Sequence, residues 1–185
     1  MQKKLTEFGI REEEVADFFR KGRPKSVFAN EILFRENQTC NSIVYIKKGV
    51  TRHFIITQNG KDITKNFTTE GNFVFYSISS FLTLKSSKIQ FQAITECELL
   101  EWDRKLLENL IPEGNWLKFY NHLLENFAIK KEEKEISLLT EKALKKYEDF
   151  LRTKGRLLNL VPHYHIASYL GMSPETLSRV RHMIS

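Results

Sequence analysis

The residues with the clearest capacity for recognition chemistry lie near the end of the chain, at Glu175, Ser178 and Arg179. An arginine donates two parallel hydrogen bonds to the edge of a guanine, and a glutamate accepts one from the amine of a cytosine. Side chains four residues apart share one face of a helix, so Glu175 and Arg179 would point together. The same spacing also permits a surface ion pair, worth under ~1 kcal/mol.

Two short helices joined by a tight turn are needed to present these side chains. Pro162 can open the first helix, because a missing N–H costs nothing at a helix start. Ile166, Ala167 and Leu170 give it a small apolar stripe, and Gly171 stands where a helix ends in a left-handed residue. This pattern predicts the first half of a helix-turn-helix.

The second helix is predicted to span 173–184. Ser173 is a good N-cap residue, and Pro174 then falls at the first helical position. Leu177, Val180 and Ile184 recur at helical spacing and can pack on the first helix. The polar residues that remain are typical of a DNA recognition helix, which enters the major groove.

The candidate DNA contacts are therefore the polar residues of the second helix and the basic residues beside it. The predicted contacts within the helix are Ser173, Glu175, Thr176, Ser178, Arg179, Arg181 and His182. The predicted phosphate contacts are Lys142, Lys145, Lys146 and Arg181. From 141 to 185, eight lysines and arginines face four acidic residues, so most of the formal net charge of +6 lies here.

The sequence before this segment predicts an α+β fold. A short amphipathic helix at 11–20 precedes strands and turns over 26–103, and such short strands at regular spacing indicate a sandwich or roll. Asn59 and Gly60 favour a hairpin with a tight primed turn. A short helix begins at Asp103 and is halted at Pro112. Further helices are predicted over 115–139 and 141–152.

The helix at 115–139 carries a regular apolar seam. Trp116, Tyr120, Leu123 and Phe127 are spaced by four, three and four residues, as in a coiled coil. The seam could pack on the strand domain of its own chain, or it could pair two copies around a two-fold axis. We favour the dimer, since helix-turn-helix readers usually bind paired half-sites.

Neither a metal site nor a catalytic set is predicted. Cys40 and Cys97 are too few for an iron–sulfur cluster, which normally takes four ligands, and they read as buried thiols. His163 and His165 diverge on a helix, and His53 is the only histidine in the strands, where a cupin-like enzyme would need several ligands. We therefore expect no enzyme activity, no cofactor and no metal. No apolar run suits a membrane helix or a signal peptide, which predicts a cytoplasmic protein.

Three segments resemble the Crp/Fnr family of bacterial transcription regulators, namely 33–52, 58–67 and the terminal 161–185. The last is especially similar to the short Crp-like regulators of Bacteroidetes-type bacteria. The resemblance implies a double-stranded β-helix (jelly-roll-like) sensor domain over 1–112, a dimerisation helix over 113–139, and an all-helical or winged helix-turn-helix domain over 140–185. It also implies a homodimer that binds a palindromic operator in double-stranded DNA, with Glu175 and Arg179 on the bases.

The sensor segment departs from the family pattern for cyclic nucleotides. That pattern has Gly-Glu-Leu followed later by an arginine, which hold the ribose and the cyclic phosphate. Here we match the first segment to Gly71, Asn72 and Phe73 and the second to the region of Ser87 and Lys88, so the carboxylate and the arginine are absent. We expect no cyclic AMP response, a degenerate pocket at these five residues, and an effector, if any, that the sequence does not name. The alternative function is a small-molecule sensor with a degenerate DNA-binding part.

Overall fold

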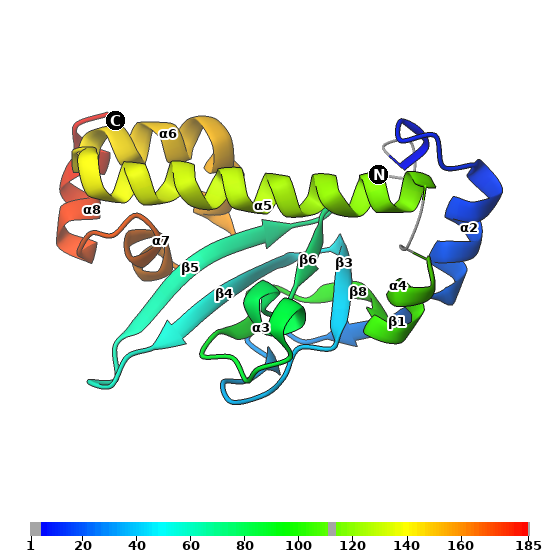
Figure 1. The fold of residues 1–185 in the computed structure, drawn as a ribbon. Coiled ribbons are helices and arrows are strands. Elements are labelled where there is room, and N and C mark those ends of the chain that lie inside the picture. The colour runs from blue at the N-terminus through cyan, green and yellow to red at the C-terminus, as the bar shows by residue number, and fades with distance from the viewer. Residues whose placement is uncertain (1–4, 111–113, 185) are drawn as a thin grey trace.

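The computed structural model describes residues 5–110 and 114–184. Its helices are α2 (Glu12–Lys21), α3 (Ile78–Thr83), α4 (Arg104–Leu110), α5 (Gly114–Thr140), α6 (Ala143–Lys154), α7 (His163–Tyr169) and α8 (Pro174–His182), with a 3-10 turn η1 (Gly155–Asn159). Its strands are β1 (Arg23–Val27), β2 (Ile32–Phe34), β3 (Ser42–Lys48), β4 (Val50–Ile56), β5 (Asp62–Thr69), β6 (Phe73–Phe75), β7 (Gln90–Ala93) and β8 (Cys97–Asp103). The helix α5 runs along the whole molecule and joins the strands to the helices near the C-terminus (Figure 1).

The eight strands form two antiparallel sheets of four, in the orders β1-β8-β3-β6 and β2-β7-β4-β5. Together with the helices, they confirm the predicted α+β fold with a jelly-roll-like domain. The inner faces of the sheets pack bulky apolar side chains against each other, and Val44, Phe91 and Leu99 are almost fully buried. We call residues 12–110 the strand domain.

The amphipathic helix α2 closes one end of the strand domain. Glu12, Glu13 and Glu14 occupy its first turn, where negative charge complements the helix dipole. Its apolar face carries Phe18, whose ring stacks on Trp102 with the centroids 4.5 Å apart. The Trp102 indole N–H also donates a hydrogen bond to the Phe18 carbonyl at 2.8 Å, so this buried donor has a partner.

The hairpin of β4 and β5 forms as predicted, but the predicted primed turn is wrong. A primed turn of the predicted kind needs a positive φ at Asn59, and only Gly60 has one, at +79°. The Thr57 N–H donates to the Lys61 carbonyl, and the Gly60 N–H donates to the Thr57 carbonyl. The connection is thus a three-residue loop in which Gly60 takes the left-handed position.

The apolar seam of α5 packs on the core of its own chain. Trp116, Tyr120, Leu123 and Phe127 all contact the buried cluster of the strand domain, and Phe119, which the seam did not include, is the most buried residue of the helix. Of the two arrangements considered from the sequence, packing on the strand domain of the same chain therefore describes these four side chains. The 27 residues of α5 span about 40 Å, which is enough to reach from α2 to α8.

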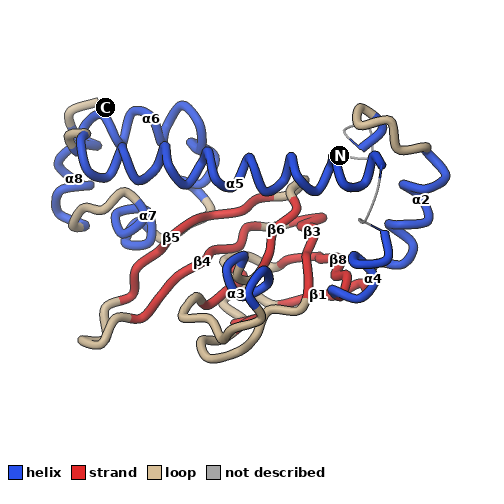
Figure 2. The backbone as a smooth tube through the Cα atoms, viewed as in Figure 1, coloured by secondary structure: helices blue, strands red, loops and turns tan. Residues whose placement is uncertain are grey.

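Residues 143–184, which we call the terminal unit, contain helices and no strand (Figure 2). The all-helical form of the predicted domain therefore holds over these residues, and the winged form does not. The core of the unit includes Leu157, Ile166, Leu177 and Val180. Ile184 was predicted to join this core, but α8 ends at His182 and Ile184 is 43% exposed. None of the described helices combines the length and apolarity required to cross a membrane.

Candidate nucleic-acid interface

The turn between α7 and α8 is fixed by its own backbone hydrogen bonds. The Met172 N–H donates to the Ala167 carbonyl at 3.0 Å, and the Gly171 N–H donates to the Ser168 carbonyl at 3.1 Å. This pair of bonds is a Schellman motif, which requires a left-handed residue, and Gly171 has a φ of +66°. A Cβ at Gly171 would lie 2.8 Å from Leu138 Cδ2, so the end of α5 also packs on the turn.

The helix α8 begins at a capped N-terminus and presents a polar face to solvent. The Ser173 hydroxyl accepts a hydrogen bond from the Thr176 N–H at 3.2 Å, and Pro174 follows it at the first turn. Leu177 and Val180 are buried, whereas Ser178 and Arg179 are exposed on the other side. The helix is therefore amphipathic and anchored by one face only.

The two side chains predicted to read bases are free of each other. Glu175 and Arg179 are both exposed, and no ion pair joins them in the part of the chain that the structure describes. The Ser173 hydroxyl lowers the pKa of Glu175, so this carboxylate is charged at neutral pH. A charged acceptor and an arginine fork thus stand side by side on one face of the helix, each open to a partner.

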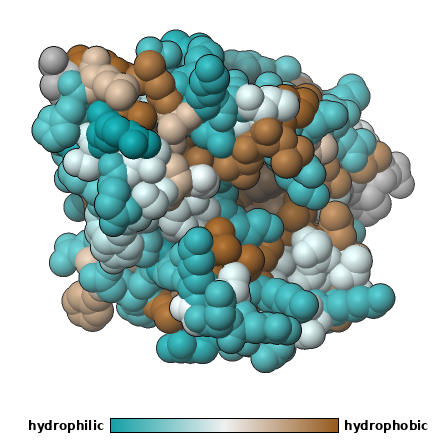
Figure 3. Space-filling view, turned by 90° about the vertical axis from the view of Figure 1, so that its left-hand side faces the viewer, coloured by the Kyte–Doolittle hydropathy of each residue, from teal (hydrophilic) through white to brown (hydrophobic). Residues whose placement is uncertain are grey.

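The other predicted contacts lie around this face. Thr176 is half-buried beside the Ser173 hydroxyl, His182 is exposed, and Arg181 contacts the His163 ring at 2.8 Å. Figure 3 shows that the end of the molecule carrying α8 is largely hydrophilic, with apolar side chains gathered around a hollow beside it.

The predicted phosphate contacts on α6 are partly engaged. Lys145 forms an ion pair with Asp149 at 3.1 Å, and the Lys146 amine donates to the Leu138 carbonyl at 3.0 Å. Lys142 is exposed at the N-cap position of α6. Exposed pairs of this kind are weak, so these cations could turn to a phosphate at small cost.

The opposite side of the terminal unit is docked on the outer face of β4 and β5. The buried side chains Val50, Phe67 and Ile94 of the strand domain belong to the same apolar cluster as the terminal unit. The Ser168 hydroxyl of α7 accepts from the Thr64 N–H at 3.0 Å and donates to the Asp62 carbonyl at 3.3 Å. The terminal unit therefore sits on the sheet through both apolar and polar contacts.

Arg52 of β4 lies at the centre of this docking surface. Its guanidinium forms two bonds to the Asp62 carboxylate, at 2.6 and 2.7 Å, and Nη1 lies 2.8 Å from His165 Nδ1. Nη1 also donates to the Thr64 hydroxyl at 3.1 Å, and Nε donates to the Gln92 side chain at 2.8 Å. We call these five residues the Arg52 cluster. Apart from a charged residue inside a strand, no pattern in the sequence indicated this cluster.

A lysine from α5 adds a further docking contact. The Lys134 amine lies 3.3 Å from the centre of the Tyr169 ring and donates to the Lys65 carbonyl at 2.6 Å. Burial lowers the pKa of Lys134 to about 6, and the cations of Lys154 and Lys65 act in the same direction. Farther along, Arg156 forms an ion pair with Glu70 at 2.9 Å.

The two segments of the predicted ligand pocket have different backbone hydrogen-bond partners. Gly71 and Asn72 form a turn that bonds to Ile46, whereas Ser87 exchanges backbone bonds with Asn37 and Gln38. Phe73 is buried under α5, and Lys88 is exposed. Within residues 5–110 and 114–184, no hydrogen bond or ion pair links Gly71 or Asn72 to Ser87 or Lys88.

Aromatic side chains occupy the interior of the strand domain. Phe34 stacks on Tyr76 with centroids 5.6 Å apart, and Tyr76 packs on Phe91 at 5.2 Å. Burial and the Glu101 carboxylate raise the pKa of Tyr76 above its ordinary value. Its hydroxyl has no hydrogen-bond partner among the described residues, so this ring acts mainly as core packing.

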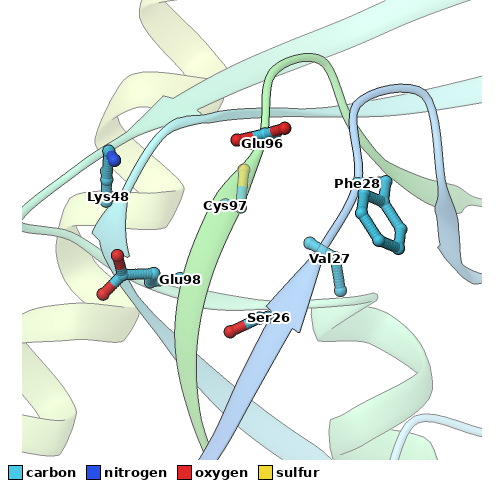
Figure 4. Close-up of a pocket in the computed structure, with 7 residues that line it drawn as sticks. All are labelled: Ser26, Val27, Phe28, Lys48, Glu96, Cys97 and Glu98. Carbon is cyan, nitrogen blue, oxygen red and sulfur yellow. The ribbon is translucent and has the colours of Figure 1, made fainter.

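A cavity of about 230 Å³ opens at the surface between the start of β8 and the end of β1. Figure 4 shows Cys97 between Lys48 and Glu98 on one side and Val27 and Phe28 on the other. Phe28 is 78% exposed, and burial raises the pKa of the Cys97 thiol. This shallow site contains none of the predicted pocket residues.

The histidines do not form a metal centre. His53 is buried in the strand domain, where Nε2 lies 2.8 Å from the Phe75 carbonyl and burial lowers its pKa to about 4. Within residues 5–110 and 114–184, no three side chains of the usual ligand types come together. The predicted divergence of His163 and His165 is observed, since one contacts Arg181 and the other Arg52.

Comparisons with known proteins agree with this architecture. Residues 24–113 match the model of the cyclic nucleotide-binding domain family. A search of curated protein sequences finds no match. Among solved structures, FixK2 from Bradyrhizobium japonicum superposes with a TM-score of 0.79 at 16% identity, covering 88% of this chain and 84% of that one.

Two further structures extend the likeness over nearly the whole chain. The catabolite activator protein of Thermus thermophilus gives a TM-score of 0.60 at 21% identity, covering 97% of this chain and 85% of that one. A protein from Eubacterium rectale assigned to the Crp/Fnr family gives 0.71 at 15% identity, covering 99% and 82%. Residues 24–113 are therefore similar to a cyclic nucleotide-binding domain, and the chain shares the fold of these solved regulators.

Proposed function

We propose that this chain is a DNA-binding transcription regulator of the Crp/Fnr type that reads a palindromic operator as a homodimer. The observation that carries the proposal is the outer face of α8, where Glu175, Ser178 and Arg179 are all exposed while Leu177 and Val180 anchor the helix. A helix held by one face and polar on the other can enter the major groove without unfolding its support.

Phosphate contacts would fix the register of α8 on the duplex. The exposed N-terminal end of α6 carries Lys142, Lys145 and Lys146, and Arg181 lies on α8 itself. Contacts of this kind supply affinity and orientation but carry no sequence information. We therefore expect replacement of these lysines to weaken binding to all sequences alike and to lower its salt dependence.

Dimerisation would use the part of α5 that its own chain leaves open. The aromatic seam is occupied by the strand domain, but Ile129, Ile136 and Leu139 are 53%, 55% and 79% exposed. Their spacing of seven and three residues is that of a coiled-coil seam. We propose that a second copy covers this stripe, so that two α8 helices face successive major grooves.

The strand domain is proposed to lack a cyclic AMP response. Such a ligand needs an arginine fork and a carboxylate, and the matched residues supply neither. The packed rings of Phe34, Tyr76 and Phe91 also occupy the interior of the domain. The surface cavity beside Cys97 is a candidate site for an unidentified small-molecule effector. The cytoplasmic location stays a prediction.

Selection of bound sequences from a random DNA pool tests the proposal. The expected result is a symmetric site with two half-sites one helical turn apart, about 34 Å. A pool that shows no enrichment, together with tight binding of a metabolite, would instead favour the small-molecule sensor with a degenerate DNA-binding part. The stripe is tested separately by Ile136→Glu, which should convert a dimer into a monomer in sedimentation experiments.

A further inference from the structure

The Arg52 cluster joins two parts of the molecule through a single buried cation. The Arg52 side chain is 4% exposed, and its other partners Asp62, Thr64 and Gln92 all belong to the strand domain. His165 is the only member that comes from the terminal unit. Arg52 Cζ lies 4.1 Å from the centre of the Phe54 ring, so a cation–π contact also holds the guanidinium.

The close approach of Arg52 Nη1 to His165 Nδ1 favours the neutral form of His165. An arginine has five N–H donors and no acceptor, so the nitrogen 2.8 Å from its Nη1 must carry a lone pair. His165 is therefore neutral when the terminal unit is docked, with any ring proton on Nε2. A second proton would place an N–H against the guanidinium and bring two cations together.

We propose that Arg52 positions the terminal unit by holding neutral His165 on the strand domain, and that protonation of His165 weakens this docking. The orientation of α8 then depends on a residue far from it in the sequence. The predicted effect on DNA binding rests on the proposed function, because a protein that reads DNA needs α8 held in a fixed orientation. The docking itself can be measured without DNA.

The groups that face His165 support this assignment. Arg52 of β4 and the Asp62 carboxylate of β5 are the charged neighbours, and Tyr164 packs on the ring with centroids 4.1 Å apart. Burial and the Arg52 cation lower the pKa of His165 to about 4, while Asp62 acts weakly in the opposite direction. Since the ordinary value is about 6.5, the undocked unit takes up a proton that the docked unit excludes.

The pH dependence due to His165 must be distinguished from that of the other titratable groups on the docking surface. Lys134 faces Tyr169 with a pKa of about 6, so it also favours docking in its neutral form. Lys65 and Lys154 lie near it, and Arg156 pairs with Glu70. His53 is buried inside the strand domain and does not face the terminal unit. A variant that removes only the titration of His165 therefore gives the cleanest comparison.

The experiment measures docking in the full chain through two spin labels. Cysteines introduced at Gln58 and Glu148 would be exposed on the hairpin and on α6, whereas Cys40 and Cys97 are 0% and 3% exposed. Pulsed electron spin resonance then gives the distance distribution at pH 7.5 and pH 5.0. His165→Asn keeps an acceptor near the Nδ1 position without titrating, and His122→Asn is the matched control on an exposed histidine of α5.

For the parent protein we expect the docking constant to fall between these pH values by about thirtyfold more than for His165→Asn. His122→Asn should behave like the parent. At pH 7.5, His165→Leu should lower docking by roughly tenfold to a hundredfold, because one charge-assisted hydrogen bond is lost. Arg52→Lys, which keeps the charge without the fork, is a milder variant should His165→Leu fail to fold.

Equal pH dependence of the parent and His165→Asn, or unchanged docking in both His165→Leu and Arg52→Lys, would overturn the inference. The DNA arm compares the parent with His165→Leu on the selected operator and on random DNA. A loss confined to the operator supports positioning, whereas tighter operator binding would contradict it. Because the label experiment contains no DNA, failure of the docking inference is distinguishable from failure of the proposed function.

Discussion

The strand domain and the terminal unit complete their cores in different ways. The strand domain packs two sheets, α2 and α5 around a large cluster in which Phe91, Val44 and Trp102 are at most 1% exposed. The terminal unit has a much smaller cluster, and that cluster includes Val50, Phe67 and Ile94 of the strand domain. The core of the strand domain is closed without the terminal unit, whereas the core of the terminal unit is completed by the strand domain.

This difference explains why β4 is buried on both sides. Thr51 and His53 contribute to the interior of the roll, while Arg52 and Val50 are covered by the terminal unit. A chain of about 40 residues seldom buries enough surface to fold alone. The strand domain therefore supplies both stability and orientation to the helix that is proposed to read DNA.

The largest expected effect comes from the closed core. Phe91→Ala removes a ring that is 0% exposed and packs on both His53 and Tyr76. We expect a loss of about 3–5 kcal/mol in the free energy of unfolding, because a cavity is left in a tightly packed site. Urea unfolding followed by tryptophan fluorescence and by helical circular dichroism should shift together. A shift in only one signal would contradict a shared core.

The core of the terminal unit should respond locally. Leu177→Ala removes a side chain that is 1% exposed, with an expected cost of about 2–5 kcal/mol. Because the strand domain is closed without it, hydrogen exchange should accelerate in α6, α7 and α8 only. Leu144→Ala on the 37% exposed face of α6 is the matched control and should cost far less. Faster hydrogen exchange in β3 and β8 would contradict a strand-domain core that is closed without the terminal unit.

Two glycines of the terminal unit should respond in opposite directions to replacement by alanine. Gly171→Ala places a Cβ at a φ of +66° and 2.8 Å from Leu138, so we expect a loss of about 1–2 kcal/mol. Gly155 has helical angles and open space around it, so Gly155→Ala should instead stabilise by about 0.4–1 kcal/mol. Thermal unfolding of the two variants should move in opposite directions, and parallel shifts would argue against the turn geometry.

The smallest effect is expected at the N-cap of α8. Ser173→Ala removes the acceptor of the Thr176 N–H and should cost about 1 kcal/mol. Ser173→Asp keeps an acceptor and should recover most of that loss in thermal unfolding. If the alanine variant matched the parent protein in both stability and DNA affinity, the cap would have no role in presenting the polar face.

Local signals in the sequence were enough for the elements and for the outer face of α8. Gly171 and Ser173 mark a turn and a cap through their own backbone requirements, so two short helices joined by a tight turn followed from the residue types. The alternation of the strands likewise predicted the roll. These features depend on neighbours within a few residues, which a single sequence displays directly.

Contacts between distant segments could not be read in the same way. The seam of Trp116 and Phe127 fits a dimer or an intramolecular core equally well, and only the three-dimensional packing distinguishes them. Arg52 and His165 are 113 positions apart, so nothing local joins them. The match of the ligand segment to Gly71 relied on a short pattern, and it stays a prediction; Gly71 bonds to Ile46, whereas Ser87 bonds to Asn37 and Gln38.

The proposed function requires that Arg179 on α8 reads a base. It is tested most directly by fluorescence anisotropy on the selected operator with the parent protein, Arg179→Ala and Arg152→Ala, the last removing the same charge from α6. Arg179→Ala should lose about 1–3 kcal/mol of binding free energy on the operator and tolerate replacement of one base pair that the parent rejects. Arg152→Ala should keep the sequence preference of the parent. Equal affinity of the parent and Arg179→Ala for every duplex would contradict base recognition by Arg179.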